Sequence, residues 1–405
     1  MNFLIKTSFI VASIAFSSLP LMAFDFGVIF DGTDKAYTND VSDISGSEDW
    51  ENELIGTVTA NAKGNLTASG TQRISAEGNF VYKYTNDSEG ESENLKTADL
   101  TLLKYTGVFA TGSAKSIVSF GRFFVGDVTS VVLSQVNDGL MYQYLSDKIN
   151  ASVYGGWTGL TNAHNTTVLD GEESDFFLDT DSVYYCNTSY ALCSASVSFP
   201  YILFNQTITL EGIGLIGTNG INSDNGGDWR IYGTFALNGP LASCLFYKLY
   251  TCFSKEKDSD LSNLSSLYFD YYTSWKDLSF SLGGVYASGK TGSFSSFKGI
   301  TSQTAFNSFG DVQYSGIIKS GLSASIKPFT NLFIKLGSDV VLKYDEKGIE
   351  RDENQELKYH GTQVYASMAY QVFTDVKAAL SVSDYFAKDE GNNKLLGTVS
   401  LTFAL

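Results

Sequence analysis

The sequence is short of proline, histidine and charged residues, and each shortage narrows the possible fold or function. Only 4 of the 405 residues are Pro and 2 are His, which leaves little room for a histidine-based metal or acid–base site. Charged residues make up 18% of the chain, below the value of about 25% that is usual in soluble domains. The net charge is −17. Nucleic acid is therefore excluded as a partner, because binding to phosphates requires a basic face.

Long apolar runs are also missing, except near the N-terminus. Residues 7–19 are almost wholly apolar or small, follow Lys6, and precede a small residue, Ala23. This is the pattern of a secretory signal peptide, and the run is shorter than the roughly 20 residues that a membrane-spanning helix needs. We expect residues 1–23 to be removed as a signal peptide. Residues 24–405 contain no apolar window long enough for a spanning helix, so any membrane role must depend on β-strands or a surface helix.

Apolar and polar residues alternate with a period of two through most of residues 24–405. In 331–345, for example, Leu332, Ile334 and Leu336 share one face, whereas Lys335 and Asp339 share the other. Successive side chains of a strand point to opposite faces, so this alternation predicts β-strands. The predicted strands are 24–31, 53–62, 73–84, 97–108, 115–123, 139–146, 149–158, 190–199, 203–215, 228–237, 242–254, 264–274, 278–288, 312–326, 331–344, 358–370, 375–386 and 395–405.

The connectors between these strands alternate between mostly long, such as 159–189, and mostly short, such as 147–148. An even number of antiparallel strands with long loops at one end and short turns at the other is typical of outer-membrane barrels. The predicted fold class is all-β: one transmembrane, antiparallel, up-and-down β-barrel of about 18 strands over residues 24–405. The number becomes 16 if residues 115–146 pair differently. A soluble β-sandwich also alternates, but it rarely holds this many strands in one domain.

Two short motifs carry a resemblance to a known family. In the last strand, Gly397 precedes the alternating apolar residues Leu401, Phe403 and Leu405, and this resembles the C-terminal assembly signal of outer-membrane proteins. It departs from that signal at Leu395, where a polar residue is usual, and in ending on Leu rather than Phe. The segments 120–122 (Phe-Gly-Arg) and 138–139 (Asp-Gly) resemble the region around the third loop of bacterial porins. The pattern over 24–405 resembles porins as a group and indicates no subfamily.

The resemblance implies a bacterial outer-membrane protein that the barrel assembly machinery inserts through its last strand. It implies a channel for passive diffusion of small polar solutes, surrounded by outer-membrane lipid. Loop 124–138 would then form the constriction, with Arg122 at its base and Asp127 within it. Many porins trimerise, so the resemblance leaves open whether this protein forms a homo-oligomer.

The alternation also assigns charged side chains to the barrel interior. This inward set has nine bases (Lys63, Arg73, Lys83, Arg230, Lys248, Lys319, Lys335, Lys343, Lys377) and seven acids (Asp25, Glu77, Glu211, Asp228, Asp270, Asp339, Asp375). Half of the 44 acids lie instead in connectors 32–52, 85–96, 159–189 and 345–357. A basic ladder of Lys319, Lys335 and Lys343 facing acids such as Asp127 would favour anions or neutral polar solutes mildly. The candidate pore-lining residues are Arg122, Asp127, Arg230, Lys319, Lys335, Asp339 and Lys343.

No motif predicts a cofactor, a metal site or an enzymatic activity. His164 and His360 match no catalytic spacing, and no Cys-x-x-Cys pair suggests zinc. Cys186 and Cys193 could form a disulfide across a loop hairpin, because an exported protein meets oxidising conditions. One alternative function is a surface barrel whose acidic loops bind host or matrix molecules. A weaker alternative is a barrel-borne hydrolase that uses His164 near Asp170.

Overall fold

A computed structural model describes residues 24–39, 49–158, 190–202, 204–217, 229–257, 259–290, 294–301, 303–305, 312–344, 356–388 and 393–405. Its elements are 18 β-strands. They are β1 (Phe24–Asn39), β2 (Asp49–Asn65), β3 (Gln72–Asp87), β4 (Ser92–Thr111), β5 (Ala114–Gly126), β6 (Ser134–Leu145), β7 (Asn150–Trp157), β8 (Tyr190–Phe199), β9 (Thr207–Gly217), β10 (Trp229–Ala242), β11 (Leu245–Glu256), β12 (Ser262–Tyr272), β13 (Ser279–Ala287), β14 (Ile317–Phe329), β15 (Leu332–Tyr344), β16 (Leu357–Phe373), β17 (Val376–Ala387) and β18 (Lys394–Ala404). Among the described residues, no helix is long and apolar enough to cross a membrane.

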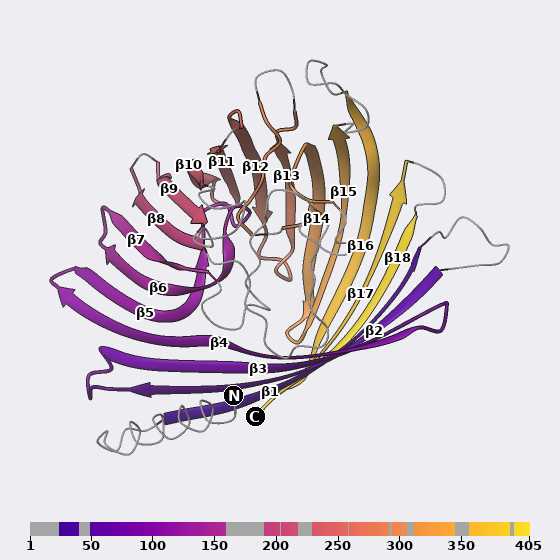
Figure 1. The fold of residues 1–405 in the computed structure, drawn as a ribbon, viewed down its shortest axis with the longest axis horizontal. Helices are drawn as coiled ribbons and strands as arrows, with labels where there is room; N and C mark the ends of the chain where they lie inside the picture. Colours follow the sequence, from indigo (N-terminus) through magenta and orange to yellow (C-terminus); the bar gives the residue numbers. More distant parts are fainter. Residues whose placement is uncertain are drawn as a thin grey trace.

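The strands form one closed antiparallel sheet (Figure 1). Each strand pairs with the next along the chain, and β18 pairs with β1 from Ile29↔Ala404 to Asn39↔Lys394. The prediction of an antiparallel up-and-down barrel of 18 strands is therefore confirmed. The 16-strand alternative is wrong, because β5 and β6 form a regular hairpin from Lys115↔Leu145 to Gly126↔Ser134.

Strand boundaries follow the prediction closely at the short turns and less closely at the long loops. Strand β8 has the predicted bounds, whereas β1 continues to Asn39 instead of ending at residue 31. Beyond residue 31 the outer face of β1 carries Gly32, Asp34 and Ala36. The apolar alternation stops there, although the backbone ladder continues as far as Asn39. The predicted loop 32–52 is consequently shorter, and part of its charge belongs to the wall.

The two faces of the sheet differ as the alternation predicts. Outward side chains are apolar and exposed: Leu322 is 61% exposed, Leu336 55% and Val399 56%. The alternate positions of the same strands, such as Ser323, Lys335 and Ser400, face the interior and are partly buried. An apolar band around a barrel with a polar interior requires a different solvent on each side of the wall.

Several tyrosine rings lie over glycines of the neighbouring strand. A Cβ atom on Gly337 would lie 2.3 Å from the ring of Tyr365, and one on Gly283 would lie 2.1 Å from the ring of Tyr268. Each glycine is the direct cross-strand partner of its tyrosine. An aromatic ring that covers a cross-strand glycine fills the gap that the missing side chain leaves in a curved sheet. These pairs account for part of the 38 Gly and 24 Tyr in the sequence.

Gly121 occupies a strand position that a side chain cannot enter without distortion. Its φ is +113°, and a Cβ there would lie 2.0 Å from the carbonyl oxygen of Leu103 on β4. We expect Gly121→Ala to destabilise the barrel by at least about 2 kcal/mol, because backbone strain and a backbone clash combine. Thermal unfolding of the detergent-refolded protein measures this. Gly32→Ala is the control, since nothing lies within 4 Å of a Cβ at Gly32. Equal unfolding temperatures for the two variants would contradict the expectation.

Candidate channel constriction

Two loops enter the barrel interior and pack against one part of its wall. The first is 127–133, between β5 and β6, and the second lies between β13 and β14, where the structure describes residues 288–290, 294–301, 303–305 and 312–316. Val132 and Leu133 of the first loop, and Phe297 and Ile300 of the second, are fully buried. Residues from inward faces of the wall complete this inner core, among them Tyr154, Leu192, Ile213, Leu215, Tyr232, Tyr250, Leu264 and Val285. Most of the wall residues of the core lie on β5–β13, with Ile317, Val341 and Tyr385 on β14, β15 and β17, so the loops pack mainly against β5–β13.

Asp127 closes the first loop on itself. Its carboxylate accepts hydrogen bonds from the backbone N–H of Thr129 (2.8 Å) and Leu133 (2.9 Å) and from the Thr129 hydroxyl (2.5 Å). The backbone N–H of Val128 donates to Glu211 of β9 at 2.9 Å and holds the loop to the wall. Burial raises the pKa of the Asp127 carboxyl, although the hydrogen bonds from Thr129 and Leu133 act in the opposite direction. Asp127 thus stabilises the conformation of this loop from a buried position.

The two loops are also hydrogen-bonded to each other. The carbonyl of Val132 accepts from the N–H groups of Ile300 (2.7 Å) and Thr301 (3.1 Å). The Thr301 hydroxyl donates to the Gln135 side chain at 3.2 Å and accepts from the N–H of Ser134 at 3.1 Å. The loops therefore form one structural unit, although about 170 residues separate them along the chain.

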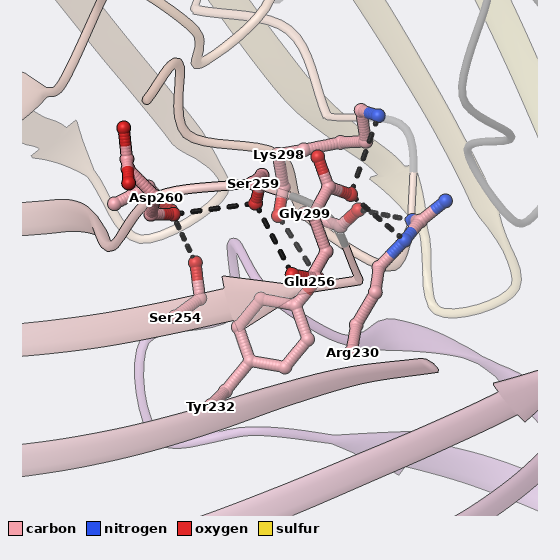
Figure 2. A network of polar contacts seen from close by, with 9 residues as sticks. Arg230, Tyr232, Ser254, Glu256, Ser259, Asp260, Lys298 and Gly299 are labelled. Carbon is pink, nitrogen blue, oxygen red and sulfur yellow. Dashed lines mark hydrogen bonds and ion pairs between the residues drawn. The ribbon is translucent and has the colours of Figure 1, made fainter. Parts of the chain in front are cut away.

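A charged cluster fastens the second loop to β10 and β11 (Figure 2). Glu256 lies 3.4 Å from Nε of Arg230 and 3.5 Å from Nζ of Lys298. Arg230 donates to the carbonyl of Gly299 at 3.5 Å, and the Tyr232 hydroxyl donates to the carbonyl of Lys298 at 3.0 Å. Arg230 is buried, so this sequence-predicted lumen residue acts as an anchor for the loop.

Next to this core, the interior holds a polar cavity of about 280 Å³ along β12–β17. Lys319 of β14 and Lys335 and Asp339 of β15 line it, together with Gln363 and Tyr365 of β16. Nζ of Lys319 lies 3.5 Å from Asp339 and donates to the carbonyl of Ala305 at 2.6 Å. Nζ of Lys335 lies 5.5 Å from the centre of the Tyr365 ring. Lys319 and Lys335 thus both line this cavity, and Lys319 also contacts the second loop.

A second charged cluster on the wall was not identified from the sequence. Glu53 of β2 lies between Lys35 of β1, at 3.1 Å, and Lys83 of β3, at 2.7 Å. Lys83 was assigned to the interior, but Lys35 was placed in a loop because the strand 24–31 was predicted too short. Continuing the alternation through Thr33 and Tyr37 would have placed Lys35 on the inward face.

The remaining sequence-predicted residues take varied positions. Arg122 is almost fully buried, within 3.5 Å of Asp99 and 3.2 Å of Asp138. Lys343 lies near the loop end of β15, opposite Ile317. The predicted constriction loop 124–138 is limited to 127–133, because β5 and β6 extend into it. The side chains of Leu401, Phe403 and Leu405 are exposed on the outer face, and Gly397 pairs with Ala36 and Val382.

Some predictions fall on residues outside those that the structure describes. These residues are the signal peptide 1–23, Cys186, His164, Asp170 and Asp228. Cys193 is exposed on β8, and its disulfide with Cys186 stays a prediction. Within the described ranges, no group of three His, Cys, Asp or Glu side chains could hold a metal ion.

The burial of Asp127 predicts a pH dependence of stability. A carboxyl whose pKa is raised by folding adds stability at low pH, and this contribution is lost as the pH rises through the folded-state pKa. We expect wild type to gain unfolding temperature relative to Asp127→Asn as the pH falls from about 8 to about 4. Thermal unfolding in matched buffers checks this, with the exposed Asp147→Asn as a control. A pH-independent difference between wild type and Asp127→Asn would contradict it.

Comparison with known proteins shows similarity in structure alone. No protein-family model and no curated protein matches the chain. Among solved structures, Pseudomonas aeruginosa OccK7 (OpdD) superposes with a TM-score of 0.60 at 12% identity, over 94% of this chain and 98% of that one. P. aeruginosa OccK2 (OpdF) in complex with glucuronate gives 0.59 at 9%, and OpdK with vanillate gives 0.57 at 8%, each over the same shares of the two chains. The chain therefore shares its fold with these proteins.

Proposed function

We propose that this protein is a porin of the bacterial outer membrane that forms an aqueous channel for small polar solutes. The observation that carries the proposal is the division of the barrel interior. Two loops pack mainly against β5–β13, and the interior keeps a polar cavity of about 280 Å³ along β12–β17. The apolar outer band supports a bilayer as the surroundings, because a soluble protein rarely exposes so extensive an apolar surface.

The proteins of similar structure support the same proposal. One solved structure presents OpdK as an outer membrane protein from P. aeruginosa. The ligands of OccK2 and OpdK, glucuronate and vanillate, are small polar carboxylates. Assembly through the last strand, with Leu401, Phe403 and Leu405 facing outward, completes the proposal of an outer-membrane location.

No chemical step forms part of the proposed function. His360, the described histidine, lies at the loop end of β16 with its ring centre 6.2 Å from that of Tyr385. The Tyr385 hydroxyl donates to the backbone carbonyl of His360 at 3.1 Å. These contacts position His360 against β17, and the proposal assigns the histidine no chemical step.

Single-channel recording in planar bilayers tests the proposed function directly. The refolded mature protein should give discrete, stable openings whose conductance rises with salt concentration. The polar side of the lumen is the physical reason, because hydrated ions need a continuous wet path. A folded, heat-modifiable barrel that never conducts would overturn the proposal.

A mild anion preference is proposed for this channel. Lys335 and Lys343 lie on the inward face of β15, and two lysines surround the single carboxylate of Glu53. Replacing Lys335 and Lys343 by Glu reverses the charge at both positions. The reversal potential in a salt gradient should then move toward cation preference. Lys276→Glu, in the turn between β12 and β13, is the matched control. An unchanged reversal potential in the double variant would refute the preference.

A further inference from the structure

A row of small hydroxyl side chains crosses the open side of the interior. Cross-strand pairing connects Ser279 to Ser325, Ser325 to Lys335, Lys335 to Ser367, Ser367 to Ser381, and Ser381 to Thr398. We call Ser279, Ser325, Ser367, Ser381 and Thr398 the hydroxyl belt. It contributes one residue from each of β13, β14, β16, β17 and β18, with Lys335 in the position on β15.

The belt faces the interior. Its members are partly buried, whereas the sequence neighbours Phe280, Met368, Leu380 and Val399 are exposed on the outer face. Of the belt, Ser367 and Ser381 line the cavity of about 280 Å³, together with Lys335 and Tyr365. The middle of the belt therefore borders the part of the lumen that the loops leave open.

Two hydroxyls of the belt, those of Ser279 and Ser325, bond to each other at 2.8 Å. Hydroxyls on β7–β12 do the same, as in Ser152–Ser196 (2.8 Å) and Thr251–Ser265 (2.8 Å). Within the described part of the chain, the side chains of Ser367, Ser381 and Thr398 make no hydrogen bond to protein. Their donors and acceptors are therefore directed to water or to a passing solute.

Charged side chains flank the segment Ser367, Ser381 and Thr398 of this row. Lys335 adjoins Ser367, and Lys35, which is bound to Glu53, is the cross-strand partner of Thr398. Tyr365 precedes Ser367 by two residues on β16, and its ring lies over Gly337 of β15. The ring therefore lies against the wall beside the belt. The row thus combines hydroxyls, a cationic donor and an aromatic ring.

We propose that the hydroxyl belt is a binding track for polyhydroxylated solutes, such as monosaccharides and polyols. This inference rests on the proposed channel function. Neighbouring strands are about 4.8 Å apart, so a molecule with several hydroxyls can bond to two successive belt residues directly or through one water. Each such bond replaces a hydrogen bond between the solute and water, and it therefore offsets the free-energy cost of dehydrating the solute. The Tyr365 ring offers an apolar surface to the C–H face of a sugar ring.

The test compares two neutral solutes of matched hydrodynamic size in single-channel recordings in KCl. Glucose carries adjacent hydroxyls, whereas a short polyethylene glycol offers mainly ether oxygens. Glucose should reduce or modulate the current more than the glycol does. The variant Ser367→Ala/Ser381→Ala/Thr398→Val should keep the KCl conductance and weaken the excess effect of glucose at least about fivefold, as expected for the loss of one or more hydrogen bonds. Ser152→Ala/Ser196→Ala, on β7 and β8, is the control and should behave as wild type.

The outcomes separate the belt from the channel. Normal KCl conductance with equal effects of glucose and glycol, or with an unchanged glucose effect in the triple variant, overturns the belt and leaves the channel standing. If the protein never conducts, the channel proposal fails. Saturation-transfer NMR of glucose on the detergent-solubilised barrel then decides the belt: transfer that is lost in the triple variant supports it, and no transfer, or equal transfer, overturns it.

Discussion

Pairing of every backbone N–H and C=O group with a neighbouring strand is the constraint on which this structure depends. The sheet has no free edge among its described strands, because β18 returns to pair with β1. The N–H and C=O groups of Val28 both bond to Leu405, at 3.0 and 2.8 Å. In a bilayer, an open sheet would leave such groups without partners, at a cost of several kcal/mol each. Closure also fixes the inward or outward direction of each side chain, because a shift by one residue would turn a whole strand over.

Closing so many strands creates a second problem, because the interior becomes too wide for side chains to fill. On one side of the interior, two loops fill this space in place of side chains from the wall. Val132 and Leu133 pack with Phe297 and Ile300 in an apolar core inside the barrel. Charged groups nearby attach the loops to the wall. Arg230 and Lys298 form ion pairs with Glu256, and Glu211 accepts a hydrogen bond from the N–H of Val128. The two inner loops therefore form a folded unit anchored to β9–β11.

The sequence was sufficient to predict the strands because the period of two is a local property. All 18 strands were predicted, and boundaries failed mainly where the outer face stops being apolar, as after residue 31 of β1. The inner core could not be predicted, because its contacts join residues about 170 positions apart, such as Val132 and Ile300. The hydroxyl belt was missed for a related reason. It depends on the register of six neighbouring strands, and Ser367 and Ser381 share a row only because β16 and β17 pair as they do.

Charge pairing also depends on contacts between distant residues, so a count of charged residues on the inward faces does not give the electrostatic field in the lumen. A charge influences a solute only if it faces the open side and lacks a close counter-charge. Arg230 meets Glu256 beneath the second loop, and Lys319 meets Asp339. Arg122 is enclosed by Asp99 and Asp138. These pairs contribute to packing and to the position of the loops, and their fields largely cancel within a few ångströms. The field along the path is then set by few residues, and between them the wall presents hydroxyls. In the proposed channel, a solute would meet a mostly neutral hydrogen-bonding surface, which would make hydrogen-bonding capacity as important as charge for selection.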